Sequence, residues 1–372
     1  MTPPLSAVVL AAGEGTRMKS ARPKPVHLLC GRPMVLHVVD ALGELEVDRA
    51  VVVVGHGAER VTKALLERAP ARLAIDFVEQ RVQRGTGDAV SVALTAFPDD
   101  DMEDGEIVVL PGDTPLLRPS TLAALVRRHR DKGAAASVLT TRLHNPTGYG
   151  RVVRDKNDRV ARIVEEADAT PEERAIDEVN TSIYCFRRSV LAPALRRLSP
   201  ENAQGEYYLT DVIEVLHDAG YPVVSLVVQD PLEAAGVNDR SQLAVAEAEL
   251  RSRTNQLWMQ RGVTMLDPAR TYIDATVELG LDVTLFPGTM LQGSTVVGPG
   301  AQLGPDCRLV DCSVAEGAVV EHTVGRQAEI GADARVGPFA SLGPGSRVRP
   351  GTVTGPFFSA TAMPHDENDE GS

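Results

Sequence analysis

Residues 6–25 are SAVVLAAGEGTRMKSARPKP, a short apolar run that passes directly into a glycine-containing loop. The run is rich in β-branched residues, which favours a buried strand. Gly13 and Gly15 allow the backbone after this strand to approach a ligand closely, and Arg17 and Lys24 add positive charge where phosphates would lie. The segment lacks both the G-x-x-x-x-G-K-S/T pattern and the third glycine of the dinucleotide fingerprint. We therefore predict a different kind of phosphate-binding loop.

The same alternation of apolar runs and amphipathic stretches continues to about residue 235. Parallel strands need crossover connections, which helices commonly provide, so this order predicts a doubly wound, mainly parallel, Rossmann-like α/β sheet. In such sheets ligands bind at the carboxyl ends of the strands. The predicted strands are Ala7–Leu10, Ala50–Val54, Leu73–Val78, Glu106–Leu110, Ala135–Leu139 and Tyr221–Val228, and the predicted helices are Val35–Leu45, Ala58–Arg68, Ala89–Ala96, Ser120–Lys132 and Leu209–Ala219.

The periodicity changes after Gly262, where aliphatic residues recur every six positions. A hexapeptide repeat favours a parallel β-helix, and the pattern resembles the left-handed form with three hexapeptides in each of roughly four coils. We expect a nucleotide-binding domain at 1–238, a linker helix at 239–261, the β-helix at 262–356 and a disordered acidic tail at 357–372. The inward residues are predicted to be Ile273, Leu279, Leu285, Leu291, Val297, Leu303 and Leu309 and, after a slip of three, Val324, Ile330, Val336, Leu342 and Val348.

Charge and cysteine content exclude several other classes of protein. The formal charge of −13 argues against a nucleic-acid partner. The four cysteines form no C-x-x-C pair, which argues against a zinc site and a disulfide framework and favours the cytoplasm. No run of 18 apolar residues occurs, so we expect no membrane span.

Two further strings follow predicted strands. Gln80 precedes Gly85 and Thr86 in QRVQRGTG, and amide side chains that donate and accept hydrogen bonds suit the edge of a pyrimidine. Asp113 follows the strand that ends at Leu110, where a carboxylate with phosphate oxygens and water could hold magnesium. An aspartate that caps a turn is the more frequent event, so Asp113 by itself does not establish a metal site.

The strings NPTGYGRVVR (145–154), IVEEADAT (163–170), EVNTSIY (178–184), NAQGEYYLTD (202–211) and AGVNDRSQL (235–243) follow. With the first loop they resemble, in order and spacing, the uridylyltransferase half of the bifunctional bacterial UDP-N-acetylglucosamine pyrophosphorylase and glucosamine-1-phosphate acetyltransferase family. That resemblance implies a magnesium-dependent enzyme that forms UDP-N-acetylglucosamine and pyrophosphate from UTP and N-acetylglucosamine-1-phosphate. The attacking phosphate group of the sugar-1-phosphate is already an anion near neutral pH, so the reaction requires no dedicated general base. Catalysis then consists of alignment of the substrates and neutralisation of their charge.

The resemblance also implies a role for each matching residue. Arg17 and Lys24 would neutralise the phosphates, and Asp113 and Asn238 would bind Mg²⁺. Lys24 and Asn238 would also bind substrate. The remaining substrate-binding residues would be Leu10, Ala11, Ala12 and Gly13 for the nucleotide, Gln80, Gly85 and Thr86 for uracil, and Gly150, Glu165 and Asn180 for the sugar.

The chain departs from the family pattern in a few places. Pro111 and Ser182 stand where some members have Tyr and Gly. Gly343 stands at the position of an arginine of the acetyltransferase site, and that site's Lys, His, Tyr and Asn have no counterparts before residue 372. We therefore expect a shortened β-helix without acetyltransferase activity, and a homotrimer formed through the β-helix.

Two other functions remain open at this point. The chain could use another nucleoside triphosphate and sugar-1-phosphate, since related guanylyl- and thymidylyltransferases also carry short β-helices. It could also be a non-catalytic regulatory paralogue. The presence of Arg17, Lys24, Asp113 and Asn238 together favours an active enzyme.

Overall fold

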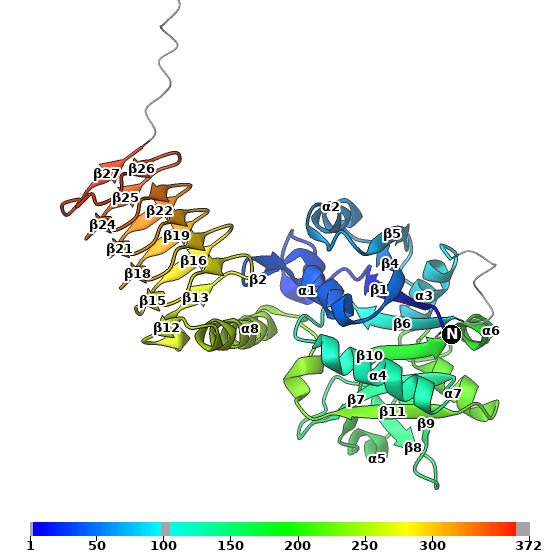
Figure 1. Cartoon of the computed structure of the whole chain (residues 1–372). Helices are drawn as coiled ribbons and strands as arrows, with labels where there is room; N and C mark the ends of the chain where they lie inside the picture. The colour runs from blue at the N-terminus through cyan, green and yellow to red at the C-terminus, as the bar shows by residue number, and fades with distance from the viewer. Residues whose placement is uncertain (1–2, 98–104, 362–372) are drawn as a thin grey trace, which may run out of the picture. The chain divides into compact units, whose positions relative to one another are not determined.

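The computed structural model describes residues 3–97 and 105–361, and the chain divides into two compact units. One unit contains the residues up to Leu28 together with Pro33–Ala246, and the other contains Leu29–Arg32 and the residues from Glu247 onward (Figure 1). The division falls inside helix α8 (Arg240–Gln260), which covers almost the whole of the predicted linker helix. Most of the predicted acidic tail, from residue 362 onward, lies outside the described residues.

A nine-stranded sheet with both faces covered by helices forms the first unit. Its strand order is β11-β7-β10-β6-β1-β4-β5, and β1 pairs in parallel with both β4 and β6. All six predicted strands are present, and the doubly wound α/β fold is confirmed. The strands are β1 (Leu5–Ala11), β4 (Val47–Val54), β5 (Ala74–Glu79), β6 (Glu106–Pro111), β7 (Ala136–Arg142), β8 (Arg151–Arg154), β9 (Val160–Val164), β10 (Glu178–Arg187) and β11 (Val223–Val228).

Strand β10 was not predicted from the sequence, and it changes the character of the sheet. It runs antiparallel to β6 and β7, and also pairs with β8, which forms an antiparallel pair with β9. Its sequence EVNTSIYCFR interrupts the apolar pattern with Glu178, Asn180 and Thr181, yet all three side chains are buried. Polar residues at buried positions interrupt the apolar periodicity from which strands are predicted, so this strand was missed.

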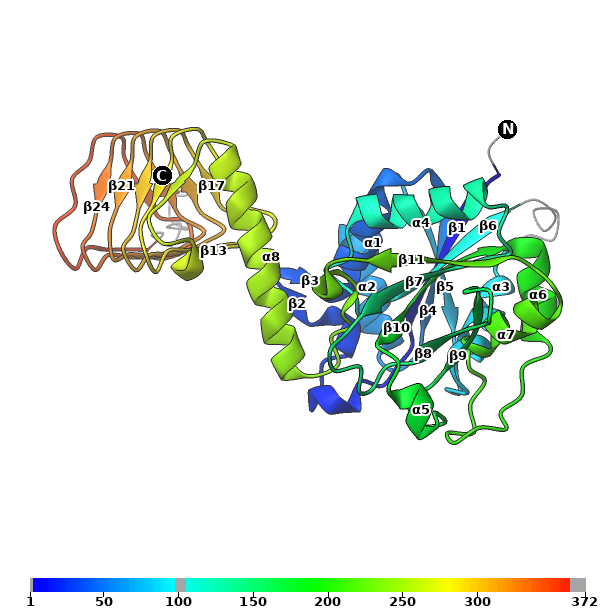
Figure 2. The same cartoon turned by 90° about the horizontal axis from the view of Figure 1, so that it is seen from below.

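Helices lie on both faces of the sheet (Figure 2). An apolar layer holds them against each face. Helices α1, α2 and α4 contribute to one layer through Leu36, Leu65 and Leu122, and α3, α6 and α7 contribute to the other through Val90, Leu191 and Ile213. Their bounds are α1 (Met34–Asp40), α2 (Ala58–Arg68), α3 (Thr86–Leu94), α4 (Pro119–Asp131), α6 (Arg188–Leu195) and α7 (Asp211–Asp218), with the short α5 (Pro171–Arg174) beside β8.

The second unit is a short left-handed parallel β-helix, as the hexapeptide pattern predicts. Its strands form three parallel stacks, β12-β15-β18-β21-β24, β13-β16-β19-β22-β25-β27 and β14-β17-β20-β23-β26. These run from β12 (Thr264–Met265) through β13 (Tyr272–Ile273), β14 (Glu278–Leu279), β15 (Thr284–Leu285), β16 (Met290–Gln292), β17 (Val296–Val297), β18 (Gln302–Leu303), β19 (Arg308–Val310), β20 (Ser313–Val314), β21 (Val319–Val320), β22 (Val324–Arg326), β23 (Glu329–Ile330), β24 (Arg335–Val336), β25 (Ser341–Leu342) and β26 (Arg347–Val348) to β27 (Ser359–Ala360).

The prediction of Val324 as an inward residue is wrong. Val324 is 58% exposed, and Gly325 takes the inward position opposite Leu309. A Cβ atom on Gly325 would lie 2.9 Å from Leu309 Cδ2 and 3.3 Å from Cys312 Sγ, so these side chains already fill the interior there. The slip of three residues does not occur at one place. After Leu309 the inward residues are Val314, Val320, Gly325 and Ile330, so several steps between inward residues are five residues long and not six.

The β-helix also extends beyond the predicted boundary at residue 356. Ser359 and Ala360 form β27 and pair with Ser341 and Leu342 of β25. These residues therefore add to the β-helix, although the sequence placed them in the tail.

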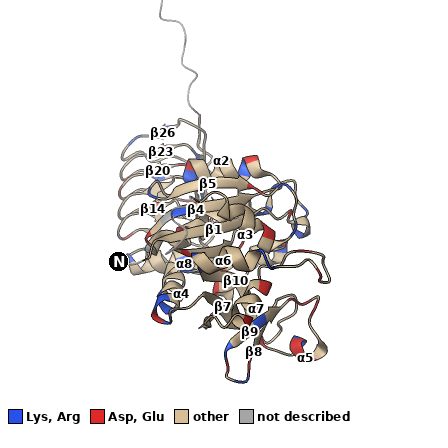
Figure 3. Ribbon diagram, turned by 90° about the vertical axis from the view of Figure 1, so that its right-hand side faces the viewer, with Lys and Arg blue, Asp and Glu red and all other residues tan. Residues whose placement is uncertain are grey.

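Among the described residues of the first unit, both acidic and basic residues occur on the ribbon (Figure 3). Within the described part of the chain, no helix is both long enough and apolar enough to cross a membrane.

Candidate active site

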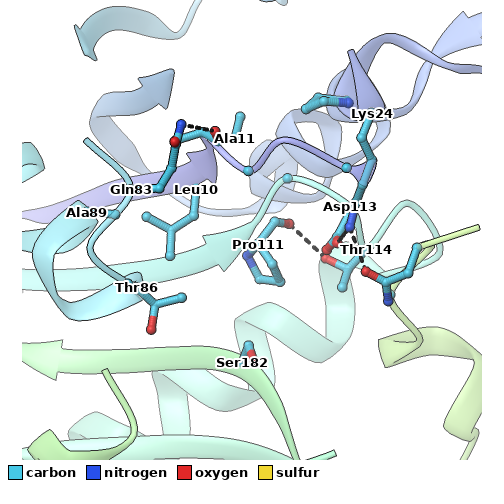
Figure 4. Close-up of a pocket in the computed structure, with 18 of the residues that line it drawn as sticks. Leu10, Ala11, Lys24, Gln83, Thr86, Ala89, Pro111, Asp113, Thr114 and Ser182 are labelled. Carbon is cyan, nitrogen blue, oxygen red and sulfur yellow. Dashed lines mark hydrogen bonds and ion pairs between the residues drawn. The ribbon is translucent and has the colours of Figure 1, made fainter. Parts of the chain in front are cut away.

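A cavity of about 710 Å³ opens in the first unit at the carboxyl ends of β1 and β6, where a doubly wound sheet is expected to bind its ligand. In Figure 4, Gln83 and Thr86 lie toward one end of this cavity and Lys24 and Asp113 toward the other. The cavity brings together most of the residues predicted to bind substrate or metal, namely Leu10, Ala11, Ala12, Gly13, Lys24, Gln80, Gly85, Thr86, Asp113, Gly150, Glu165, Asn180 and Asn238.

At one end of the cavity, Lys24 contacts both residues predicted to bind the metal. Its ammonium group donates to Asn238 Oδ1 at 2.7 Å and forms an ion pair with Asp113. The two acceptors come from distant parts of the chain, and the backbone joins them because the Val237 N–H donates to the Asp113 carbonyl at 2.8 Å. A carboxylate oxygen and an amide oxygen therefore converge on one cationic group.

The glycines of the first loop shape the backbone around Lys24. Gly15 has φ +64°, and a Cβ atom there would lie 2.6 Å from Lys24 Cβ. Gly13 is exposed, and apart from its chain neighbours no described residue has an atom within 4 Å of the position of an added Cβ. Gly15 is thus required by the protein's own packing, whereas the space beside Gly13 is open to a ligand.

The opposite end of the cavity is built on the turn into α3. Gln80 is buried and its amide donates to Asp88 Oδ2 at 2.8 Å and to the Gly85 carbonyl at 3.2 Å. Gln83, which is exposed, donates to the Ala12 carbonyl at 3.2 Å. The Thr86 hydroxyl accepts from the Leu209 N–H at 3.0 Å. Gln80 is thus held by the protein itself, which leaves Gln83 and Thr86 as the more exposed polar groups here.

The third wall comes from β8, β9 and β10. The Asn180 N–H donates to the Gly150 carbonyl at 2.9 Å, and the Asn180 amide donates to the Tyr184 hydroxyl at 2.7 Å. Glu165 accepts from the Thr210 hydroxyl at 3.0 Å, and its burial raises the pKa of its carboxyl group. A carboxyl group and an amide group thus lie beside the buried Gly150, and together they are suitable for binding the hydroxyl and amide groups of a sugar.

Comparisons with known proteins agree with this geometry. A family model described as nucleotidyl transferase matches residues 6–259, which include every residue discussed at the cavity. The chain belongs to the nucleotidyl transferase family.

Relatives in this family match beyond the cavity-bearing unit. A protein named bifunctional protein GlmU from Thermobifida fusca is 48% identical over 329 residues, which cover 88% of this chain and 67% of the relative. Proteins of the same name from Desulfitobacterium hafniense and Streptomyces avermitilis are each 47% identical, over 88% of this chain and 70% and 67% of their own lengths. The predicted resemblance is confirmed, and the chain is a nucleotidyltransferase of the UDP-N-acetylglucosamine pyrophosphorylase class.

Two of the departures from the family pattern, Pro111 and Ser182, line the nucleotidyl transferase cavity. Ser182 has φ 61°, a left-handed conformation that glycine adopts at little cost, so a glycine at this position in relatives fits the local backbone. The Ser182 N–H donates to Asn180 Oδ1 at 3.0 Å. Pro111 ends β6, directly before Gly112 and Asp113.

Arg17 is the predicted site residue that the structure does not bring to the cavity. It lies in the short 3₁₀ helix η1 (Thr16–Met18), is exposed, and is not among the residues that line the cavity. Its role in phosphate binding stays a prediction. Conversely, Tyr149, Thr114 and Glu206 line the cavity but were not predicted. Tyr149 lies between two glycines in NPTGYGR, so the signal for it was present in a motif already recognised.

The residues predicted to hold Mg²⁺ fit that ion in chemistry and placement. Asp113 and Asn238 offer oxygen atoms, which Mg²⁺ prefers, and both already contact the Lys24 cation. Among the described residues, no group of three or more His, Cys, Asp or Glu side chains could hold a metal by itself. Two protein oxygens with phosphate and water oxygens are a common arrangement for this ion.

Proposed function

We propose that the chain is a magnesium-dependent uridylyltransferase that joins UTP and N-acetylglucosamine-1-phosphate to form UDP-N-acetylglucosamine and pyrophosphate. The observation that carries this proposal is the convergence of Lys24, Asp113 and Asn238 at one end of a cavity whose other walls carry amide, hydroxyl and carboxyl groups. The relatives at 43–48% identity support the same reaction class.

In this mechanism an oxygen of the sugar phosphate attacks the α-phosphorus of UTP, and pyrophosphate leaves. The attacking group is ionised near neutral pH, so the chain needs no side chain to remove a proton. Lys24 would neutralise charge on the triphosphate, and the open backbone at Gly13 would admit it closely. Gln83 and Thr86 would bind the base, while Gly150, Glu165 and Asn180 would orient the sugar.

Asp113 and Asn238 would hold Mg²⁺ in the proposed enzyme. When bound, the ion would supply positive charge to the phosphate oxygens. Lys24 contacts the same two side chains, so the chain would keep them close together before the nucleotide arrives.

The test is pyrophosphate release by the purified chain with Mg²⁺, across a panel of nucleoside triphosphates and sugar-1-phosphates. We expect turnover to be highest with UTP and N-acetylglucosamine-1-phosphate, and to be lost when EDTA removes the metal. Preference for another pair would replace the substrates proposed. Absence of turnover with every pair would favour a regulatory protein.

We also propose that these 372 residues do not transfer acetyl groups. Gly343, which stands at the position of an arginine in the acetyltransferase site, supports this: it offers no side chain to a ligand. The expected result is no acetylation of glucosamine-1-phosphate by acetyl-CoA. Acetylation at a rate similar to that of uridylyl transfer would refute this part of the proposal.

Exposed aliphatic side chains on the β-helix support assembly into a homotrimer through this unit. Val296 is 44% exposed, Val324 58% and Val353 71%. Burial of such groups between copies would be favourable. Light scattering should give a mass near three chains at micromolar concentration, and a stable monomer would contradict the proposal.

A further inference from the structure

Two of the proposed sugar-binding residues are each followed directly by one member of an ion pair. Gly150 precedes Arg151, and Glu165 precedes Glu166. Gly150 and Glu165 line the cavity, whereas Arg151 and Glu166 do not. The ion pair therefore joins the two residues that directly follow these cavity-lining positions.

Arg151 is enclosed to a degree that is unusual for an arginine. Its side chain is only 2% exposed, and Nη2 lies 2.6 Å from Glu166 Oε2. The same nitrogen lies 3.4 Å from the Arg174 carbonyl oxygen at the end of α5. Enclosing a guanidinium group is costly unless it is paired and hydrogen-bonded, so a well-defined position for Arg151 is expected.

The two charged groups hold the cavity-lining loop Gly148–Gly150 from both sides. The Arg151 guanidinium donates from Nη1 to the Tyr149 carbonyl. The bond to Arg151 and, to a smaller extent, the Gly148 N–H lower the pKa of the Glu166 carboxyl, which places this carboxylate beside the backbone of Gly148. All three loop residues line the cavity.

This loop needs such support because of its composition. Gly148 has φ +88°, and glycines on both sides of Tyr149 give the backbone more freedom than other residues would. The strand pairing that follows begins at Arg151, opposite Val164 and Val179. Strand pairing thus begins only after the loop. The Arg151–Glu166 pair holds in place the part of the cavity wall, Gly148–Gly150, that precedes the paired strand.

We propose that Arg151 and Glu166 are positioning residues for the sugar-phosphate substrate. The pair fixes Gly148–Gly150 and the backbone next to Glu165, without touching substrate itself. This inference rests on the proposed function for the identity of the substrate, but the ordering of the loop by the pair does not depend on it.

The kinetic test uses Arg151→Met and Glu166→Gln, assayed with whichever sugar-1-phosphate the wild-type chain uses best. We expect the KM for the sugar-1-phosphate to rise by about tenfold, because a displaced wall binds the sugar less tightly in the ground state and the transition state alike. The KM for the nucleoside triphosphate and kcat should stay within about twofold of wild type, because the nucleotide end of the cavity is built on other elements.

Arg130→Met is the matched control. Arg130 Nε lies 2.7 Å from Glu106 Oε2, so its replacement also breaks a partly buried ion pair. Glu106 begins β6, whereas the cavity lies beyond the other end of that strand. Arg130→Met should lower the melting temperature while leaving both KM values unchanged.

Hydrogen exchange followed by mass spectrometry tests the inference without turnover. In Arg151→Met and Glu166→Gln, a peptide containing residues 148–150 should exchange about tenfold faster than in wild type, and in Arg130→Met it should not. If Arg151→Met does not fold, the milder Glu166→Gln still decides the question. Unchanged exchange, or equal increases in both KM values, would overturn the inference. A wild-type chain without turnover would instead refute the proposed function.

Discussion

The ammonium nitrogen of Lys24 lies 2.7 Å from Oδ1 of Asn238, a residue 214 positions further along the chain. Asp113 approaches the same ammonium group, and both Lys24 and Asp113 are largely enclosed, with side chains 15% and 20% exposed. Three segments that follow different parts of the sheet therefore meet at one charged point. A group so placed is available to anionic phosphates and is little screened by solvent.

Replacement of Lys24 should affect catalysis far more than folding. Lys24→Met should lower kcat/KM for uridylyl transfer by about 10²-fold or more, because charge on the phosphates is no longer neutralised. Lys63→Met on α2 is the control, since Lys63 is 74% exposed and pairs with the exposed Glu67. Pyrophosphate release should remain normal in that control. Near-normal kcat/KM in Lys24→Met would remove this residue from the mechanism.

Asp113→Ala should abolish measurable turnover without unfolding the chain. The substitution removes the only carboxylate of the proposed magnesium site, and it leaves Lys24 without its ion-pair partner. The melting temperature should change little, because Asp113 does not belong to the apolar core and Lys24 keeps its hydrogen bond to Asn238. Asp76→Ala removes an exposed ion pair with Arg49 instead and should retain activity. Normal activity in Asp113→Ala would contradict the metal assignment.

Gly15→Ala tests whether loop geometry places Lys24. The new Cβ would meet Lys24 Cβ at 2.6 Å, and an L-residue at φ +64° is strained. Gly133→Ala carries similar strain at φ +54° but has open space around the new atom. Gly133→Ala should lose about 1 kcal/mol of unfolding free energy in urea and Gly15→Ala more than that because of the added clash, whereas only Gly15→Ala should lose tenfold or more in kcat/KM. Equal activities would show that strain alone accounts for the effect.

Gly13→Ala should separate ligand binding from stability. Beyond the chain neighbours, the described part of the chain places no atom within 4 Å of the added Cβ, so the unfolding free energy should change by less than about 0.5 kcal/mol. The KM for the nucleoside triphosphate should rise by about tenfold, because the methyl group occupies space that the triphosphate would use. Gly355→Ala, with equally open surroundings in the β-helix, should change neither quantity. An unchanged KM in Gly13→Ala would mean that the ligand does not approach this part of the loop.

Stability should depend on pH through Asp211 at the start of α7. Burial, and then the charges of Glu214, Glu165 and Asp168, raise the pKa of its carboxyl to about 6. The folded chain therefore binds this proton more tightly than the unfolded chain, so this contribution to stability is full below about pH 4 and is lost as pH rises through about 6. Asp211→Asn should remove this dependence.

The measurement is urea unfolding at pH 5 and pH 7.5. Asp211→Asn should increase the unfolding free energy at pH 7.5 by on the order of 1 kcal/mol, a value that allows for solvent screening of this partly buried group. Asp218→Asn is the control on the same helix, because its side chain is 69% exposed. If the two variants shift stability equally at both pH values, Asp211 is not the source of the dependence.

Local patterns predicted the elements whose burial follows a simple period. The six strands and most helices of the first unit were found because each apolar face recurs at the spacing of its own backbone. The hexapeptide spacing predicted the β-helix for the same reason. Strand β10 was not predicted because it contains the polar residues Glu178, Asn180 and Thr181. Their side chains are buried and their polar groups are paired through hydrogen bonds and ion pairs, so they leave no apolar pattern in the sequence.

The sequence by itself determined the two architectures and nearly the whole set of cavity residues, because motif strings and periodicities are properties of neighbouring residues. Only the tertiary structure decided which of those residues meet. The crossover connections of the mixed sheet bring Lys24 to Asn238. Gly325 takes the inward position in place of Val324, because Leu309 already fills the interior of that coil. Arg151 donates a hydrogen bond to the Tyr149 carbonyl. Each of these relationships depends on the path of the backbone or on the volume of neighbouring side chains. The spacing of residues along the sequence does not reveal either of these.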